Sequence, residues 1–164
     1  MATEQSSTPS QRVADLGLVV PLPSTAAGLY RSWVRVGRLL FLSGVGPKRP
    51  DGTFVTGKVG ATVSLDEARE AANLAGIQLL AAMQDAVGSL DHVVRIVKVL
   101  GMVNCAPGFT NTPAVVDGCS ALFIAVFGDE LGRGARSAVG MAELPFDICV
   151  EIEAIVEVAL DEHE

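Results

Sequence analysis

The 164-residue sequence has few cationic and few aromatic side chains. Its 12 Lys and Arg stand against 19 Asp and Glu, which gives a formal net charge of −7, and aromatic residues make up 5% of the chain. Nucleic-acid binding draws its affinity from many cationic contacts to phosphate groups. The composition therefore argues against a nucleic-acid partner.

Cysteine and histidine are also scarce. Three scattered cysteines, Cys105, Cys119 and Cys149, form neither a disulfide framework nor a zinc pattern. Two histidines, His92 and His163, are too few for a histidine-rich metal site, so we expect neither a metal nor a cofactor. The start of the chain lacks a secretory signal, and no apolar run reaches the roughly 18 residues of a membrane span. We therefore expect a cytoplasmic protein without a membrane partner.

Apolar residues are abundant, at 49% of the chain. We expect a disordered lead-in over residues 1–12, which are polar and small, and a single domain over residues 13–160. A domain of this size buries roughly 70% of its unfolded surface, and the remaining apolar surplus favours a symmetric homo-oligomer.

The first half of the chain predicts two strands and a helix. The β-rich runs Trp33–Val36 and 39–43 are separated by two turn residues, which indicates a hairpin. Apolar residues recur at helical spacing over Leu65–Val87, and Ser64 with Glu67 has the spacing of a capping box.

The second half predicts a strand over residues 93–103 and a helix that starts at Pro113 behind a Thr112 cap and ends at Phe127. Residues 134–158 predict a final β-hairpin. The order β-β-α-β-α-β-β indicates an α+β fold with two helices on one face of a mixed sheet. The other face is left to be covered by an oligomer.

The final hairpin carries the most informative charges. Arg136 begins its first strand, and Glu151 and Glu153 lie within its apolar second strand. Buried carboxylates are costly unless they are paired. A hairpin folded at residues 144–147 places Arg136 near these carboxylates, which predicts an anion site with an acid/base group beside it. The alternative is a structural ion pair across the hairpin.

Three stretches resemble a known family. They are Leu-Leu-Phe-Leu-Ser-Gly at 39–44, Gly-Lys-Val-Gly at 57–60, and Ala-Arg-Ser-Ala-Val-Gly-Met-Ala-Glu-Leu-Pro at 135–145 followed by Val-Glu-Ile-Glu-Ala. Over residues 18–158 the chain resembles the Rid/YjgF family of reactive intermediate deaminases, once labelled endoribonuclease L-PSP. Asn104 and Phe109 resemble a RidA-like subgroup with a longer loop before the second helix.

The resemblance implies a chorismate-mutase-like fold of the bacillus type. It also implies a homotrimer in which three sheets close a central barrel, with ligand clefts at the subunit boundaries. The implied reaction is hydrolysis of carboxylate-bearing enamines and imines, such as 2-aminoacrylate, to a keto acid and ammonia. Arg136 matches the family arginine, whose planar fork suits a carboxylate, and Glu151 matches the acid that positions water. Glu153, two residues on, remains an alternative to Glu151.

The same resemblance implies that Tyr30, Ser43 and Gly44 line the substrate site. Three positions depart from the family pattern, because Asp117 replaces the usual asparagine, Ala138 the frequent cysteine and Val45 the frequent glutamine. These departures favour a different imine as substrate, or a non-catalytic protein that binds keto acids and other carboxylates. A ribonuclease, suggested by the old family label, is disfavoured by the negative net charge.

Overall fold

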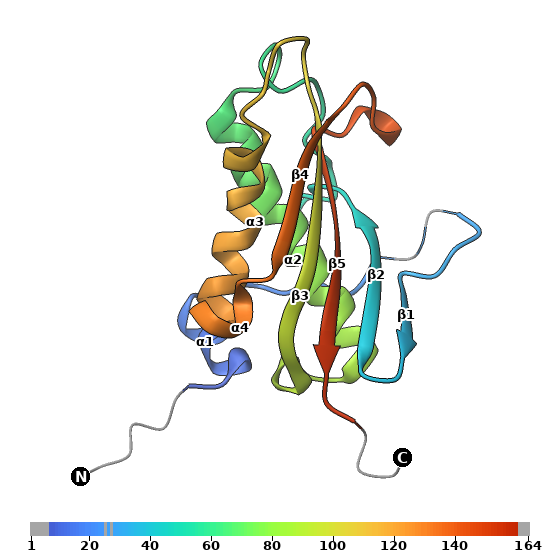
Figure 1. The fold of residues 1–164 in the computed structure, drawn as a ribbon, viewed down its shortest axis with the longest axis vertical. Helices are drawn as coiled ribbons and strands as arrows, with labels where there is room; N and C mark the ends of the chain where they lie inside the picture. Colours follow the sequence, from blue (N-terminus) through green and yellow to red (C-terminus); the bar gives the residue numbers. More distant parts are fainter. Residues whose placement is uncertain (1–6, 25, 27, 161–164) are drawn as a thin grey trace.

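The computed structural model describes residues 7–24, 26 and 28–160. Its elements in chain order are α1 (Pro9–Asp15), β1 (Trp33–Val36), β2 (Leu39–Val45), α2 (Leu65–Val87), η1 (Leu90–His92), β3 (Val93–Asn104), α3 (Thr112–Phe127), α4 (Asp129–Gly132), β4 (Ala135–Met141), η2 (Pro145–Asp147) and β5 (Val150–Val158). These elements form a mixed α+β fold built on one five-stranded sheet in the order β1-β2-β5-β3-β4 (Figure 1).

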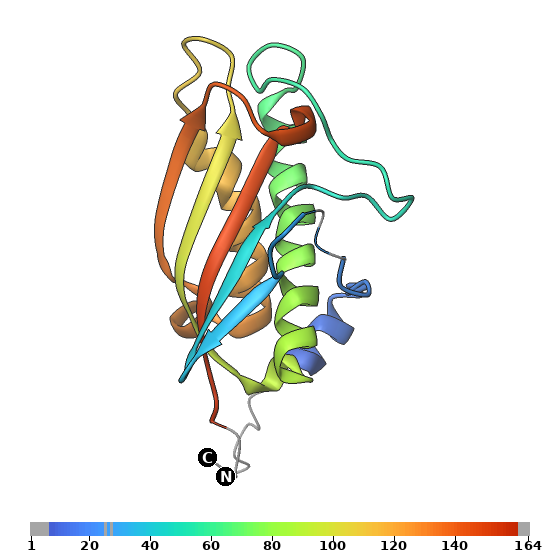
Figure 2. The same ribbon diagram turned by 90° about the vertical axis from the view of Figure 1, so that its right-hand side faces the viewer.

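The two long helices, α2 and α3, pack on the same face of this sheet (Figure 2). The core lies between the helices and the sheet, where side chains such as Leu40, Leu79, Phe123 and Ile152 are fully buried. The fold class, the two helices and their placement on one face confirm the sequence prediction.

The C-terminal strands do not form the predicted hairpin. β4 pairs in parallel with β3, whereas β5 pairs antiparallel with both β2 and β3. The sheet therefore places β3 between β4 and β5. Alternate residues of β5 are buried along its whole length, and the strand is hydrogen-bonded on both sides. An apolar strand gains more from a central position than from a hairpin at the sheet edge.

The helix boundaries agree with the sequence prediction, with one correction. Ser64 and Glu67 form the capping box of α2, as predicted. The N-cap of α3 is Asn111, not Thr112. The Thr112 hydroxyl is buried and donates a hydrogen bond to the carbonyl of Ala138, 3.1 Å away. The hydroxyl therefore joins the start of α3 to β4.

Part of the expected lead-in is helical. Residues 1–6 lie outside the described residues, but Pro9–Asp15 forms α1, with a capping box at Thr8. Arg12 of this helix donates to the carbonyl of Val126, near the end of α3. A capped helix that reaches α3 corrects the prediction of disorder for residues 9–12.

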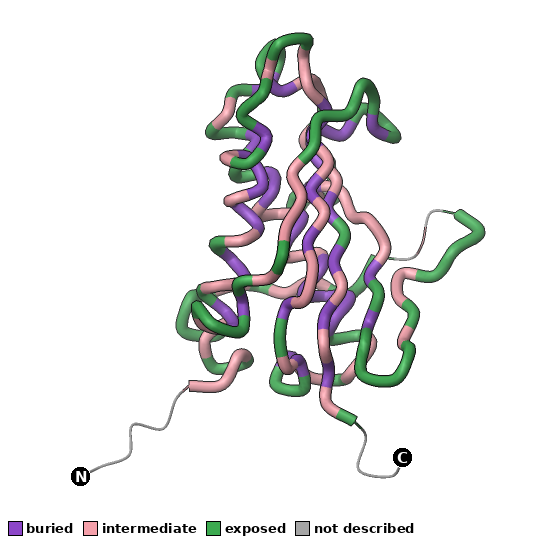
Figure 3. The backbone as a smooth tube through the Cα atoms, in the orientation of Figure 1, coloured by how far each residue is buried: buried purple, intermediate pink, exposed green. Residues whose placement is uncertain are grey.

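The sheet face opposite the helices is not covered by any other described element (Figures 2 and 3). Large apolar side chains are exposed on this open face, among them Val34, Val36 and Phe41 of β1 and β2 and Val139 of β4. Exposed large apolar side chains of this kind are typical of a protein interface. No helix among the described residues is long and apolar enough to cross a membrane.

Candidate functional site

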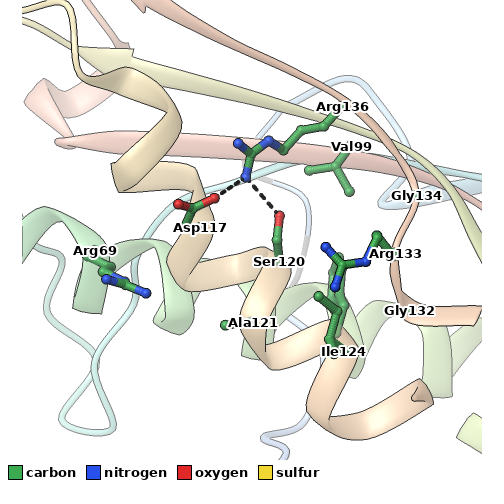
Figure 4. A pocket seen from close by; sticks show the side chains of 11 residues that line it. Arg69, Val99, Asp117, Ser120, Ala121, Ile124, Gly132, Arg133, Gly134 and Arg136 are labelled. Carbon is green, nitrogen blue, oxygen red and sulfur yellow. Dashed lines mark hydrogen bonds and ion pairs between the residues drawn. The ribbon is translucent and has the colours of Figure 1, made fainter. Parts of the chain in front are cut away.

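A cavity of about 360 Å³ lies between α3 and the edge strand β4, and we call it the arginine pocket. Its lining includes Arg69 of α2, Asp117, Ser120 and Ile124 of α3, Arg133, and Arg136 of β4. Figure 4 shows Arg136 pointing from β4 toward Asp117 and Ser120 on the facing helix. The volume is large enough for a small organic ligand.

The Arg136 guanidinium is held at one of its nitrogens. Nη1 donates to Oδ1 of Asp117 at 2.6 Å and to Oγ of Ser120 at 3.1 Å. The Arg136 side chain is 26% exposed and that of Asp117 is 49% exposed. Charge-assisted hydrogen bonds of this kind fix the plane of the guanidinium. Arg136 is therefore oriented before any ligand arrives.

A second cavity, of about 220 Å³, lies beside the C-terminal end of β2, and we call it the tyrosine pocket. Its lining includes Ser24, Tyr30, Gly44, Lys48, Phe146 and Glu151. Ser43 lies next to it, in a smaller hollow that Tyr30 and Gly44 also line. The Ser43 hydroxyl donates its hydrogen to the carbonyl of Arg31 at 2.6 Å. Its oxygen can therefore only accept a hydrogen bond from a ligand.

Glu151 is the acid of the tyrosine pocket. A β-bulge in β2 between Leu42 and Val45 brings Gly44 against its carboxylate. A Cβ atom at position 44 would lie 2.1 Å from Oε1 of Glu151, so only glycine leaves room for the carboxylate in this position. Partial burial raises the pKa of Glu151, and the neighbouring charge of Glu153 raises it further. A raised pKa makes a carboxylate a better proton acceptor near neutral pH.

A strained turn completes the rim of the tyrosine pocket. Phe146 and Asp147 both have left-handed backbone conformations, with φ of 57° and 56°. The buried amide of Asn104 donates to the Asp147 carboxylate at 3.1 Å, and Lys58 donates to the amide oxygen of Asn104 at 2.8 Å. These bonds hold the turn in a costly conformation, with the Phe146 ring 84% exposed beside the pocket.

The predicted site residues fall into two groups. Arg136 and Asp117 meet in the arginine pocket, and Tyr30, Gly44 and Glu151 meet in the tyrosine pocket with Ser43 nearby. The first group lies on the helix-covered face of the sheet, since Arg136 contacts α3. Glu151 alternates with buried neighbours on β5 and so points to the open face.

The prediction that Arg136 lies near Glu151 and Glu153 within one chain is therefore wrong. Its basis was the hairpin, and the observed insertion of β3 between β4 and β5 removes it. The predicted alternative, an ion pair between the arginine and these glutamates, is wrong for the same reason, because the Arg136 ion pair goes to Asp117.

Sequence reasoning missed several polar residues of these pockets, among them Ser120 and Lys48. Ser120 follows Asp117 by three residues, a spacing that places both on one face of a helix and could have identified it. Lys48 comes from an irregular loop and carried no comparable signal. The three cysteines are poor nucleophiles, because burial raises the pKa of each thiol, to about 11 for Cys149. Among the described residues, no group of three His, Cys, Asp or Glu could hold a metal ion.

The fold and its cavities define a small α+β protein with one pocket between α3 and β4 and a second pocket beside β2. The sequence identifies the family, because residues 10–156 match the family described as "YjgF/chorismate mutase-like, putative endoribonuclease". The chain belongs to this family.

Individual relatives agree with this placement. Protein TCP17 of Trypanosoma cruzi is 43% identical over 87% of this chain and 89% of its own length. A crystal structure of an Agrobacterium tumefaciens protein of unknown function is 38% identical and superposes with a TM-score of 0.83, covering 93% of this chain and 94% of that one. A protein from Shewanella oneidensis, described as a "putative endoribonuclease", is 28% identical with a TM-score of 0.88, covering 93% of this chain and 100% of that one.

Proposed function

We propose that this protein is a hydrolytic deaminase of reactive imines and enamines that carry a carboxylate, such as 2-aminoacrylate. The observation that carries the proposal is the oriented guanidinium of Arg136 in a cavity of ligand size. A planar, fixed arginine binds a carboxylate through two parallel hydrogen bonds. The carbon next to that carboxylate is the one that carries the imine nitrogen.

Glu151 supplies the second function that the reaction needs. Hydrolysis requires a group that takes a proton from water as the water attacks the imine carbon, and the raised pKa of Glu151 suits this role. Tyr30 lines the same pocket and offers a hydroxyl to the ligand. The amine then leaves as ammonia and a keto acid remains.

Because Arg136 and Glu151 lie on opposite faces of one sheet, one chain does not hold a complete site. We propose that the protein is a homotrimer and that each site combines Arg136 of one copy with Glu151 and Tyr30 of another. The exposed apolar side chains of the open face support association through this surface. The two pockets then meet at a subunit boundary.

The first test is hydrolysis of 2-aminoacrylate generated in situ by a serine dehydratase, followed as release of keto acid. We expect acceleration by the wild-type protein and its loss in Arg136→Ala. No acceleration by the wild-type protein above the dehydratase alone overturns the proposal for this substrate class. Acceleration that survives in Arg136→Ala overturns the assigned role of the arginine.

The second test asks whether the site is shared between copies. Arg136→Ala and Glu151→Gln subunits are each inactive in this scheme, but a mixed trimer joins an intact arginine to an intact glutamate. Random mixing at equal amounts restores about a quarter of the sites. Mixtures that stay inactive, although mass spectrometry detects mixed trimers, contradict a shared site.

A non-catalytic carboxylate-binding protein is the second candidate. The separation of Arg136 from Glu151 favours it, because the two residues line different pockets of the chain and the arginine pocket therefore binds a carboxylate without the assigned proton acceptor beside it. This candidate predicts binding of a keto acid such as pyruvate, lost in Arg136→Ala, without acceleration of 2-aminoacrylate hydrolysis.

A further inference from the structure

The tyrosine pocket contains a cation that the proposed reaction does not use. Lys48 is half-buried and lines this pocket together with Ser24. Its Nζ donates one long hydrogen bond, of 3.4 Å, to the Ser24 hydroxyl. Within the part of the chain that the structure describes, no ion pair joins Lys48 to an acid, and this includes Glu151 of the same pocket. A partly buried ammonium group gains from a counter-ion, which a ligand can supply.

The loop that carries Lys48 is held by its own hydrogen bonds. Lys48 forms an antiparallel bridge with Phe54, and the backbone nitrogen of Arg49 donates to the carbonyl of Thr53 at 2.7 Å. Asp51, at the tip of the loop, accepts from the backbone nitrogen of Thr53 at 2.9 Å. The acid of the loop is therefore bonded to the tip, and the backbone presents Lys48 to the pocket from a defined position.

The walls of the pocket near this cation are aromatic. Phe54 and Phe146 both line the pocket, and their side chains are 43% and 84% exposed. Apolar walls bind the carbon atoms of a ligand and reduce the screening of a nearby charge pair by water. The tyrosine pocket thus offers one ligand a cation at Lys48, a carboxylate at Glu151 and apolar walls.

We propose that the tyrosine pocket binds a substrate side chain that ends in a carboxylate, with this carboxylate on Lys48 and the carbon atoms against Phe54 and Phe146. This assignment rests on the proposed function, in which Arg136 of another copy binds the α-carboxylate and Glu151 activates water. It narrows the preferred substrate to α-imino dicarboxylates, whose hydrolysis releases ammonia and leaves a keto diacid. The cavity of about 220 Å³ limits the side chain to a few carbon atoms.

The test uses two stable keto acids with the same five-carbon chain in place of the imines. One is 2-oxoglutarate, which ends in a carboxylate, and the other is 2-oxopentanoate, which ends in a methyl group. Calorimetry measures the binding of each to the full chain. We expect the wild-type protein to bind 2-oxoglutarate about tenfold more tightly. Lys48→Met removes this preference and leaves the affinity for 2-oxopentanoate unchanged, whereas Lys48→Arg keeps most of the preference.

Arg49→Met is the matched control. It removes the neighbouring cation, which is exposed and donates to the Thr53 hydroxyl and the Phe54 carbonyl, and which does not line the pocket. We expect this variant to keep the preference of the wild-type protein to within about twofold. Loss of the preference in Arg49→Met shows a general effect of charge and overturns a specific site at Lys48.

Other results also overturn the proposal. The wild-type protein binds the two keto acids equally tightly or binds neither, or the preference survives in Lys48→Met. Equal weakening of both keto acids in Lys48→Met does so too, because Lys48 then acts on the α-carboxylate or on the shape of the pocket. Hydrolysis of 2-aminoacrylate and of the two five-carbon imines, generated in situ by amino-acid oxidases, is measured in parallel. Turnover of 2-aminoacrylate without the binding preference overturns only the role of Lys48, and the preference without turnover of any imine overturns only the deaminase.

Discussion

The arginine pocket and the tyrosine pocket are built by different means. Arg136, Asp117 and Ser120 project from a regular strand and a regular helix, and hydrogen bonds fix their geometry. Glu151 shares its pocket with a bulge and a strained turn, and the space beside Gly44 fixes its position. No hydrogen bond or ion pair joins the Glu151 carboxylate to another described side chain.

This difference suits two chemical tasks. A group that binds a carboxylate works best when it is rigid and charged in advance. A group that exchanges a proton benefits from partial burial and from few fixed partners, because both keep its pKa high. The comparison therefore supports the proposed roles, substrate binding for Arg136 and proton transfer for Glu151, and substitutions in each pocket test them.

Loss of the arginine is expected to have the largest effect. Arg136→Ala removes both the charge and the fork that orients the substrate, so kcat/KM falls by about 10³-fold. Arg136→Lys restores less than about tenfold of this loss, because an ammonium group lacks the planar fork. Steady-state kinetics with 2-aminoacrylate measure both variants. Full rescue by lysine contradicts bidentate binding.

Loss of the glutamate is expected to cost about 10²-fold in kcat, because Gln cannot accept a proton. The raised pKa also predicts that wild-type kcat/KM falls with acidification at a higher pH than an ordinary glutamate would give. The measurement is the pH profile of the wild-type protein and of Glu151→Gln. If the variant keeps the activity and the profile, Glu153→Gln is the next substitution, and Glu151 is not the proton acceptor.

A substitution that displaces the Glu151 carboxylate without removing it tests whether the position of this group matters. Gly44→Ala places a methyl group where Oε1 of Glu151 lies, and the flexible carboxylate moves away. We expect kcat to fall about tenfold through this misplacement of the acid. Gly140→Ala on β4 is the control, since its nearest contact would be Cys105 Sγ at 3.2 Å. Equal losses of activity in both variants contradict a specific role for Gly44.

The smallest expected effect is on stability. A carboxyl group whose pKa is raised by folding binds its proton more tightly in the folded protein, so its contribution to stability is present at acidic pH. This contribution is lost as the pH rises through the raised pKa. Glu151→Gln should therefore raise Tm relative to wild type by about 1 °C at pH 8 and by less at pH 4. A larger gain at pH 4 contradicts the direction of the pKa shift.

The sequence predicted the elements better than their arrangement. Hydrophobic periodicity and the capping box at Ser64 located α2 at its observed bounds. The β-branched run at 93–103 located β3 to within a residue. These signals are local, because each depends on residues a few positions apart.

The pairing of the last two strands could not be obtained in this way. Two strands joined by a short turn look like a hairpin in sequence, but the choice of neighbours depends on contacts with β2 and β3, far away in the chain. The error moved Arg136 and Glu151 onto one face, although register and burial place them on opposite faces. The sequence thus predicted which residue types belong to the site, but it did not predict that they are distributed over two separate pockets.

The central position of β5 has a consequence for synthesis on the ribosome. β5 is the last strand of the chain, yet it lies between β2 and β3. A nascent chain that has emerged only through β4 carries two open strand edges that face one another across a gap. Such edges recruit foreign strands. Truncations within 150–158 should therefore yield aggregates rather than a smaller native protein. The C-terminal strand β5 completes the sheet by pairing with β2 on one side and β3 on the other.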